Sequence, residues 1–202
     1  EFRGFGTVIA TEVENGLDAT QTTSTYLTDR ICAFSPASVL TALGATVFAR
    51  ESITYQTVTG GGAVPAQWTK CLSSTSVVES VEGSEAAKKV RRTSWDYGSP
   101  ISANYNVMKR QEWGEWNLDA NQDVPGDERI TEFTYASAAS GWPSIVSRVS
   151  FETVKDNAGN VSAKRRYCYV STCTVASKGL LLAVRDYLTD YTANPPVIDI
   201  QK

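Results

Sequence analysis

Residues 147–169 read SRVSFETVKDNAGNVSAKRRYCY, and they contain the clearest structural signal of the chain. Its centre, Asp156 to Asn160, holds Asp, Asn and Gly, which tolerate a positive φ angle in tight turns. The flanks, 147–154 and 161–169, are rich in β-branched and aromatic residues, which favour strands. The stretch therefore predicts a β-hairpin.

The same alternation of strand-forming and turn-forming residues recurs along the chain. It predicts about six hairpins, near residues 5–26, 39–55, 76–97, 105–135, 147–169 and 180–200. Asn15-Gly16 marks the first turn and Leu43-Gly44 the second. A helical signal occurs at Ser84 to Arg92, but residues 90–95 alternate, so we interpret this segment as strand. The sequence predicts an all-β protein, a single array of consecutive antiparallel hairpins that form a curved, open sheet over residues 1–202.

Composition narrows the classes of function. The chain has 202 residues, is 42% hydrophobic and 20% charged, and carries a net charge of -3. We expect no nucleic-acid partner, which would call for a basic surface. No apolar run is long enough to span a membrane. Histidine is absent, which removes the commonest general base and the commonest metal ligand.

The chain begins at Glu1 without Met or a signal peptide, and we interpret it as a piece of a longer protein.

The four cysteines leave two interpretations open. Cys32, Cys71, Cys168 and Cys173 include no C-x-x-C pair, so a metal or redox site is not indicated. The even number permits two disulfides in an oxidising compartment. Cys168 and Cys173 are close enough in sequence to link the end of a strand to the following loop. The alternative is four unpaired, small apolar residues.

An acidic loop is the one candidate for a metal site. Asp119, Asn121 and Asp123 form a D-x-N-x-D pattern, and Asp127 follows. Alternating oxygen ligands of this kind bind Ca²⁺ in tight loops. Position six is Val124 instead of Gly, and no Glu occupies position twelve, so the pattern also fits a solvated loop whose side chains bond their own backbone. Apart from this calcium hypothesis, no cofactor is indicated.

Aromatic and acidic residues gather near the fourth turn. Glycoside hydrolysis would need a carboxylate pair drawn from Glu112, Glu115, Asp119 and Asp123. On one continuous strand, alternation would place Trp113 and Trp116 on opposite faces. We therefore interpret the two tryptophans as packing residues of both faces and expect no enzymatic activity.

A basic run, Lys164-Arg165-Arg166, lies after the fifth turn. Across that turn stand Glu152 and Asp156. We expect cross-strand ion pairs between these groups, which would explain the basic run without a ligand.

Several phrases of the chain resemble those of Rhs/YD-repeat proteins. They are EFRGFG at residues 1–6, EWGEW at 112–116, PGDERITEFTY at 125–135, KDNAGNV at 155–161, RYCY at 166–169 and SKGLL at 177–181. The resemblance covers most of the chain and is strongest from Arg92 to Leu188. Residues 35–49 and 60–73 depart from the pattern, because the Tyr-Asp pair of the repeat is missing.

The resemblance implies a function. In bacterial Rhs toxins, the B and C components of Tc toxin complexes and teneurins, such hairpins coil into a hollow β-shell that encloses a toxin or other cargo. The chain is then expected to be a non-catalytic structural segment of a toxin-encapsulating shell, secreted or on a bacterial cell surface. Its partners would be the remainder of a longer shell chain, or further copies bound through exposed strand edges, and an enclosed toxin polypeptide.

An alternative belongs to a different class of function. An extracellular surface module would bind carbohydrate or a receptor through exposed aromatic residues, here Trp113, Trp116 and Trp142. The two hypotheses differ in the exposure of tryptophan: a patch of solvent-exposed Trp favours binding, and buried Trp favours the wall of a shell.

Overall fold

The computed structural model describes residues 6–14, 17–60, 68–81, 88–98, 105–117, 120–138, 147–170, 173, 175–176, 181–187 and 200–201. All regular secondary structure in these ranges is β-strand, and neighbours pair antiparallel apart from one short parallel pair. No helix in these ranges is long and apolar enough to cross a membrane. The prediction of an all-β open sheet built from consecutive hairpins is confirmed.

The chain divides into two compact units. The first comprises Glu1–Ser94 and Trp113–Val124, and the second comprises Trp95–Glu112 and Pro125–Lys202. Each is described separately below.

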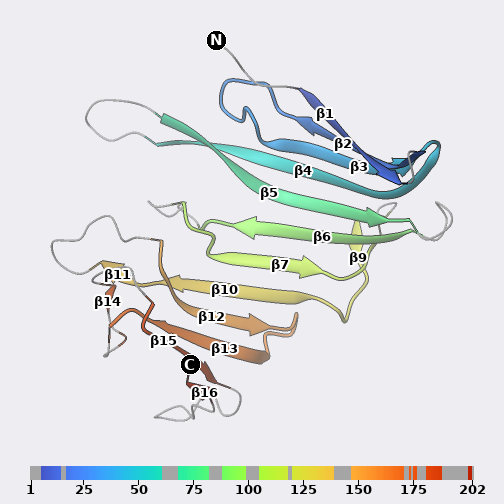
Figure 1. The fold of residues 1–202 in the computed structure, drawn as a ribbon. Helices are drawn as coiled ribbons and strands as arrows, with labels where there is room; N and C mark the ends of the chain where they lie inside the picture. Colours follow the sequence, from blue (N-terminus) through green and yellow to red (C-terminus); the bar gives the residue numbers. More distant parts are fainter. Residues whose placement is uncertain are drawn as a thin grey trace. The chain divides into compact units, whose positions relative to one another are not determined.

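The strands of the first unit pair in sequence order (Figure 1). They are β1 (Thr7–Glu14), β2 (Leu17–Tyr26), β3 (Pro36–Leu43), β4 (Thr46–Gly60), β5 (Trp68–Ser80) and most of β6 (Lys89–Asp96). A small hairpin, β8 (Trp116–Asn117) with β9 (Gln122–Asp123), completes the unit. Gly44 adopts a φ of 57° in the β3–β4 turn, as its sequence predicts. The expected Asn15-Gly16 turn and residues 84–87 lie outside the described residues.

One strand of this unit is longer than its sequence suggests. β5 begins at Trp68 and not at Ser76, and it pairs with β4 from Ala49↔Ser80 to Gly60↔Trp68. Within the segment that departs from the repeat pattern, the described residues from Trp68 on therefore belong to a paired ladder, which contains one bulge between Thr54 and Tyr55. The backbone pairing with β4 stabilises it, although its own residues give only a weak strand signal.

The second unit continues the same type of pairing. Its strands, in the order in which they pair, are β7 (Lys109–Trp113), β10 (Arg129–Tyr135), β12 (Val149–Lys155), β13 (Val161–Cys168), β15 (Ala183–Tyr187) and β16 (Ile200–Gln201). The short strands β11 (Ser137–Ala138) and β14 (Val175–Ala176) pair in parallel. The return strand expected near residue 200 is present as β16, which pairs with β15.

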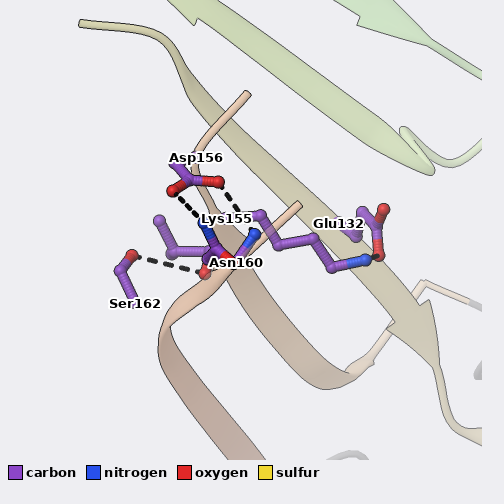
Figure 2. Close-up of polar contacts among 6 residues, drawn as sticks. Glu132, Lys155, Asp156, Asn160 and Ser162 are labelled. Atoms are coloured by element: carbon purple, nitrogen blue, oxygen red, sulfur yellow. Dashed lines mark hydrogen bonds and ion pairs between the residues drawn. The ribbon is translucent and has the colours of Figure 1, made fainter. Parts of the chain in front are cut away.

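The turn from Asp156 to Asn160 is closed by its own side chains. The Asp156 carboxylate accepts hydrogen bonds of 2.8 Å from both the backbone N–H and the side-chain amide of Asn160 (Figure 2). These bonds lower the pKa of Asp156, the side-chain bond having the larger effect. Gly159 adopts a φ of 87°. Just before the turn, Lys155 Nζ lies 2.6 Å from Glu132 Oε2 on β10 (Figure 2).

Few of the described side chains are fully buried. The buried apolar residues are Cys32, Val90 and Trp116 in the first unit and Tyr97, Cys168 and Tyr187 in the second. Strand β12 is half-buried at every position, so neither of its faces is fully covered. Because little apolar surface is removed from water, backbone ladders and cross-strand side-chain contacts carry much of the stability.

Candidate functional site

Two tryptophans and one arginine form a packed cluster in the first unit. The rings of Trp113 and Trp116 meet edge to face, with 5.3 Å between their centroids and 66° between their planes. The Arg92 guanidinium carbon lies 4.4 Å from the Trp116 centroid and 5.4 Å from that of Trp113. Trp116 is only 9% exposed. These contacts make the cluster a packing feature, held by aromatic and cation–π attraction.

The expectation that Trp113 and Trp116 occupy opposite faces was wrong. It assumed one continuous strand through residue 116. Instead β7 ends at Trp113, Gly114 and Glu115 form a bend, and Trp116 begins β8. The bend resets the alternation of side chains and brings the two rings together. Trp142, the third tryptophan of the binding hypothesis, lies outside the described residues.

Glu112 and Glu115, two of the carboxylates considered for glycoside hydrolysis, have different surroundings. Glu112 Oε2 lies 3.3 Å from Arg110 Nε on the same strand. The Glu115 side chain is exposed, and its backbone carbonyl accepts a bond from Val124 N–H. Asp119 lies outside the described residues. Within the described residues, the ion pair of Glu112 is with Arg110.

The acidic loop folds as the β8–β9 hairpin. Asp123 is paired with Trp116 across the hairpin, and Asn121 adopts a φ of 49° at the turn. The Asn117 side chain accepts a bond from Ala120 N–H, a local contact typical of solvated turns. Within the described residues, no three His, Cys, Asp or Glu side chains gather as a metal site. Because Asp119 is not described, calcium binding by Asp119, Asn121, Asp123 and Asp127 stays a prediction.

All four cysteines are joined in disulfides. Cys32 pairs with Cys71 and Cys168 with Cys173, with sequence separations of 39 and 5. Of the two alternatives left open by the sequence, the structure has the disulfides. Such bonds persist in oxidising compartments, which indicates an extracellular or periplasmic protein.

A tyrosine contact that sequence reasoning missed recurs in three hairpins. The hydroxyls of Tyr55, Tyr135 and Tyr169 each donate to a backbone carbonyl, at 2.7, 2.6 and 2.9 Å. The acceptors belong to Pro36, Val107 and Val149, each at or just before the start of the preceding strand in its hairpin. We name these three contacts the tyrosine clamps. The signal available in the sequence was a tyrosine late in the second strand of these three hairpins, or directly after it.

One face of the second unit carries balanced charge. Cross-strand pairing places on it three arginines, Arg110, Arg129 and Arg165, and three carboxylates, Glu112, Glu152 and Asp186. Arg165 Nε donates to Asp186, and this bond raises the pKa of Arg165. Tyr167 donates to Glu152 at 2.8 Å. A hollow of about 150 Å³ is lined in part by Glu152, Arg165 and Asp186. Because these carboxylates bond Tyr167 and Arg165 of the same sheet, the contacts link neighbouring strands and stabilise the sheet.

The basic run Lys164-Arg165-Arg166 does not make the ion pairs that its sequence suggested, because its residues lie on both faces of the sheet. Arg165 pairs with Asp186, and Asp156 bonds its own turn. Lys164 and Arg166 lie on the other face, with Lys164 Nζ 5.3 Å and the Arg166 guanidinium carbon 5.1 Å from the centroid of the Phe151 ring. The expected ion pairs with Glu152 and Asp156 therefore do not account for these two cations.

Comparison with known proteins adds little. No family model and no curated protein matches the chain. Among solved structures, a porin-like protein from Bacteroides uniformis aligns with 90% of this chain and 55% of its own chain, at 11% identity and a TM-score of 0.29. A similarity this low carries no argument about fold or function.

Proposed function

We propose that the chain is a non-catalytic structural segment of a shell of the Rhs/YD-repeat type, secreted or on a bacterial cell surface. In this role the sheet is part of a wall, and its mechanism is to keep an enclosed polypeptide, such as a toxin, from solvent and proteases. The tyrosine clamps are the observation that carries the proposal. They tie the two strands together in the same way in three hairpins, β3–β4, β7–β10 and β12–β13, as expected for a repeated building unit.

The outer edge of β1 is suited to pairing with a further strand, which would extend the sheet. β1 stands at the end of its sheet, and no described strand pairs with its outer edge. Val8, Ile9 and Val13 are 43%, 57% and 63% exposed. Residues 7–11 of β1 contain neither the charged side chains nor the proline with which natural edge strands avoid association, and the charges of this strand, Glu12 and Glu14, lie at its other end. An edge of this kind favours pairing with a further strand, from a longer chain or from another copy.

The tryptophan arrangement favours the wall over the alternative of an aromatic binding module. Trp116 is buried, and Arg92 covers both rings of the Trp113–Trp116 pair. A binding module would present these rings to a ligand. The aromatic side chains instead fill space within their own unit.

Sedimentation across a concentration series, with far-ultraviolet circular dichroism on the same samples, tests the proposal. We expect a β-rich signal and concentration-dependent association. Ile9→Lys should abolish association, because a charge on an edge strand opposes strand pairing. Leu43→Lys is the matched control, since Leu43 is similarly exposed at 47% but lies at the end of the inner strand β3. A β-rich monomer at every concentration would contradict a wall segment with open edges.

A further inference from the structure

The second face of the sheet in the second unit has an excess of positive charge. On the described strands, cross-strand pairing places one carboxylate on it, Glu132, with the cations Lys109, Lys155, Lys164, Arg166 and Arg185. Glu132 is engaged by Lys155 at 2.6 Å. The chain as a whole has a net charge of -3, so the charge of this face is opposite in sign to that of the whole chain. We name it the cationic face.

Two arginines at one end of this face stand directly opposite each other. Arg166 on β13 pairs with Arg185 on β15. Like charges in directly opposed positions destabilise a sheet unless something compensates them. The Nε atoms of both guanidinium groups are shielded from solvent and have no hydrogen-bond partner. The pair thus carries an electrostatic cost that no described carboxylate relieves.

The surrounding contacts hold these cations in place. The Phe151 ring lies against both Arg166 and Lys164. A terminal nitrogen of Arg166 donates to the Cys173 carbonyl at 3.0 Å, and Cys173 is fixed by its disulfide to Cys168. Side chains that are ordered before binding lose less entropy when a ligand arrives. Guanidinium groups also match the geometry of carboxylate, sulfate and phosphate oxygens.

We propose that Arg166, Arg185 and Lys164 form a binding site for the oxyanion groups of an acidic glycan, a polysaccharide that carries carboxylate or sulfate groups. The site is independent of the structural role proposed above. A bound oxyanion would offset the repulsion between the two opposed arginines. Thr134 and Thr153 lie on the same face and add hydroxyl groups suited to a polyhydroxylated ligand.

Two other polyanions fit less well. An extended acidic peptide characteristically adds to the edge of a sheet, whereas these cations stand on its face. A nucleic acid calls for a strongly positive protein, and this chain is negative overall. The disulfides also indicate an extracellular or periplasmic location, where glycans are accessible.

Titration calorimetry of the full chain with dextran sulfate, polygalacturonate and neutral dextran tests the site. We expect dextran sulfate or polygalacturonate to bind and neutral dextran not to bind. Comparison of the two charged polysaccharides shows whether the site prefers sulfate or carboxylate groups. Arg166→Gln and Arg185→Gln should each weaken binding about tenfold, the loss typical of one charged hydrogen bond. Arg129→Gln removes the same charge from the balanced face and should leave affinity unchanged.

A second measurement needs no ligand. Arg185→Gln should raise the thermal unfolding midpoint, since it relieves the like-charge pair, whereas Arg129→Gln should not. Absence of binding to any charged glycan, an equal loss in Arg129→Gln, or tighter binding of polyglutamate or of a single-stranded oligonucleotide would each overturn the proposal. Association through β1 is a separate property, so its failure would leave this result unaffected.

Discussion

Tyr135 and Val107 are joined by a hydrogen bond of 2.6 Å from the tyrosine hydroxyl to the backbone carbonyl, which ties the end of β10 to the segment that leads into β7. The Tyr135 side chain is half-buried, so water does not readily replace the lost partner. The same type of contact links Tyr55 to Pro36 and Tyr169 to Val149. A sheet with few buried side chains depends on such cross-strand bonds.

Tyr135→Phe should lower the free energy of unfolding by about 1 kcal/mol, the usual contribution of one hydrogen bond. The substitution keeps the ring and removes only the donor. Urea unfolding followed by circular dichroism measures the change. Tyr26→Phe is the control, because the Tyr26 hydroxyl has no hydrogen-bond partner among the described residues, and its loss should change stability by less than about 0.5 kcal/mol. Equal effects of the two substitutions would remove the clamp as a stabilising element.

Alkaline pH should weaken the fold through the same residues. Burial raises the pKa of Tyr97, Tyr135 and Tyr169 above the usual value near 10. A raised pKa means that folding favours the neutral phenol, so the stabilisation is complete below pH about 10 and is lost as the pH rises through the folded-state pKa. The test is to measure the free energy of unfolding below and above pH about 10, and to follow tyrosine ionisation by the ultraviolet absorbance of tyrosinate. A stability that stays constant while the tyrosines ionise would be inconsistent with buried phenols.

The sequence predicted well what local residues determine. The Asp156 to Asn160 turn was predicted because its own side chains close it. The paired strand from Trp68 was missed because its partner, β4, is distant in sequence and the pairing itself holds it. The faces of Lys164 and Arg166 were missed because register depends on a bulge between Val154 and Lys155, where the simple alternation across the turn fails.

The two disulfides should contribute unequally to stability. A cross-link stabilises mainly by restricting the unfolded chain, and more so when it closes a longer loop. With separations of 39 and 5 residues, loop closure predicts about 4 kcal/mol for Cys32–Cys71 and about 2 kcal/mol for Cys168–Cys173. Denaturant unfolding of the two double alanine variants measures the difference. A larger loss of unfolding free energy on removal of the Cys168–Cys173 disulfide would show that the packing of Cys168, which is 1% exposed, outweighs loop entropy.

Removal of the Arg92 cation should loosen the tryptophan cluster. The guanidinium lies against both rings and shields Trp116 from solvent. Arg92→Gln should therefore lower the free energy of unfolding by about 1–2 kcal/mol, the range for a partly desolvated cation–π contact. It should also increase the quenching of tryptophan fluorescence by acrylamide. Arg91→Gln is the matched control, because the neighbouring Arg91 is exposed, lies opposite Val78 and has no aromatic contact among the described residues. If both variants behave alike, the cluster owes its order to the edge-to-face contact of Trp113 and Trp116 and not to the cation.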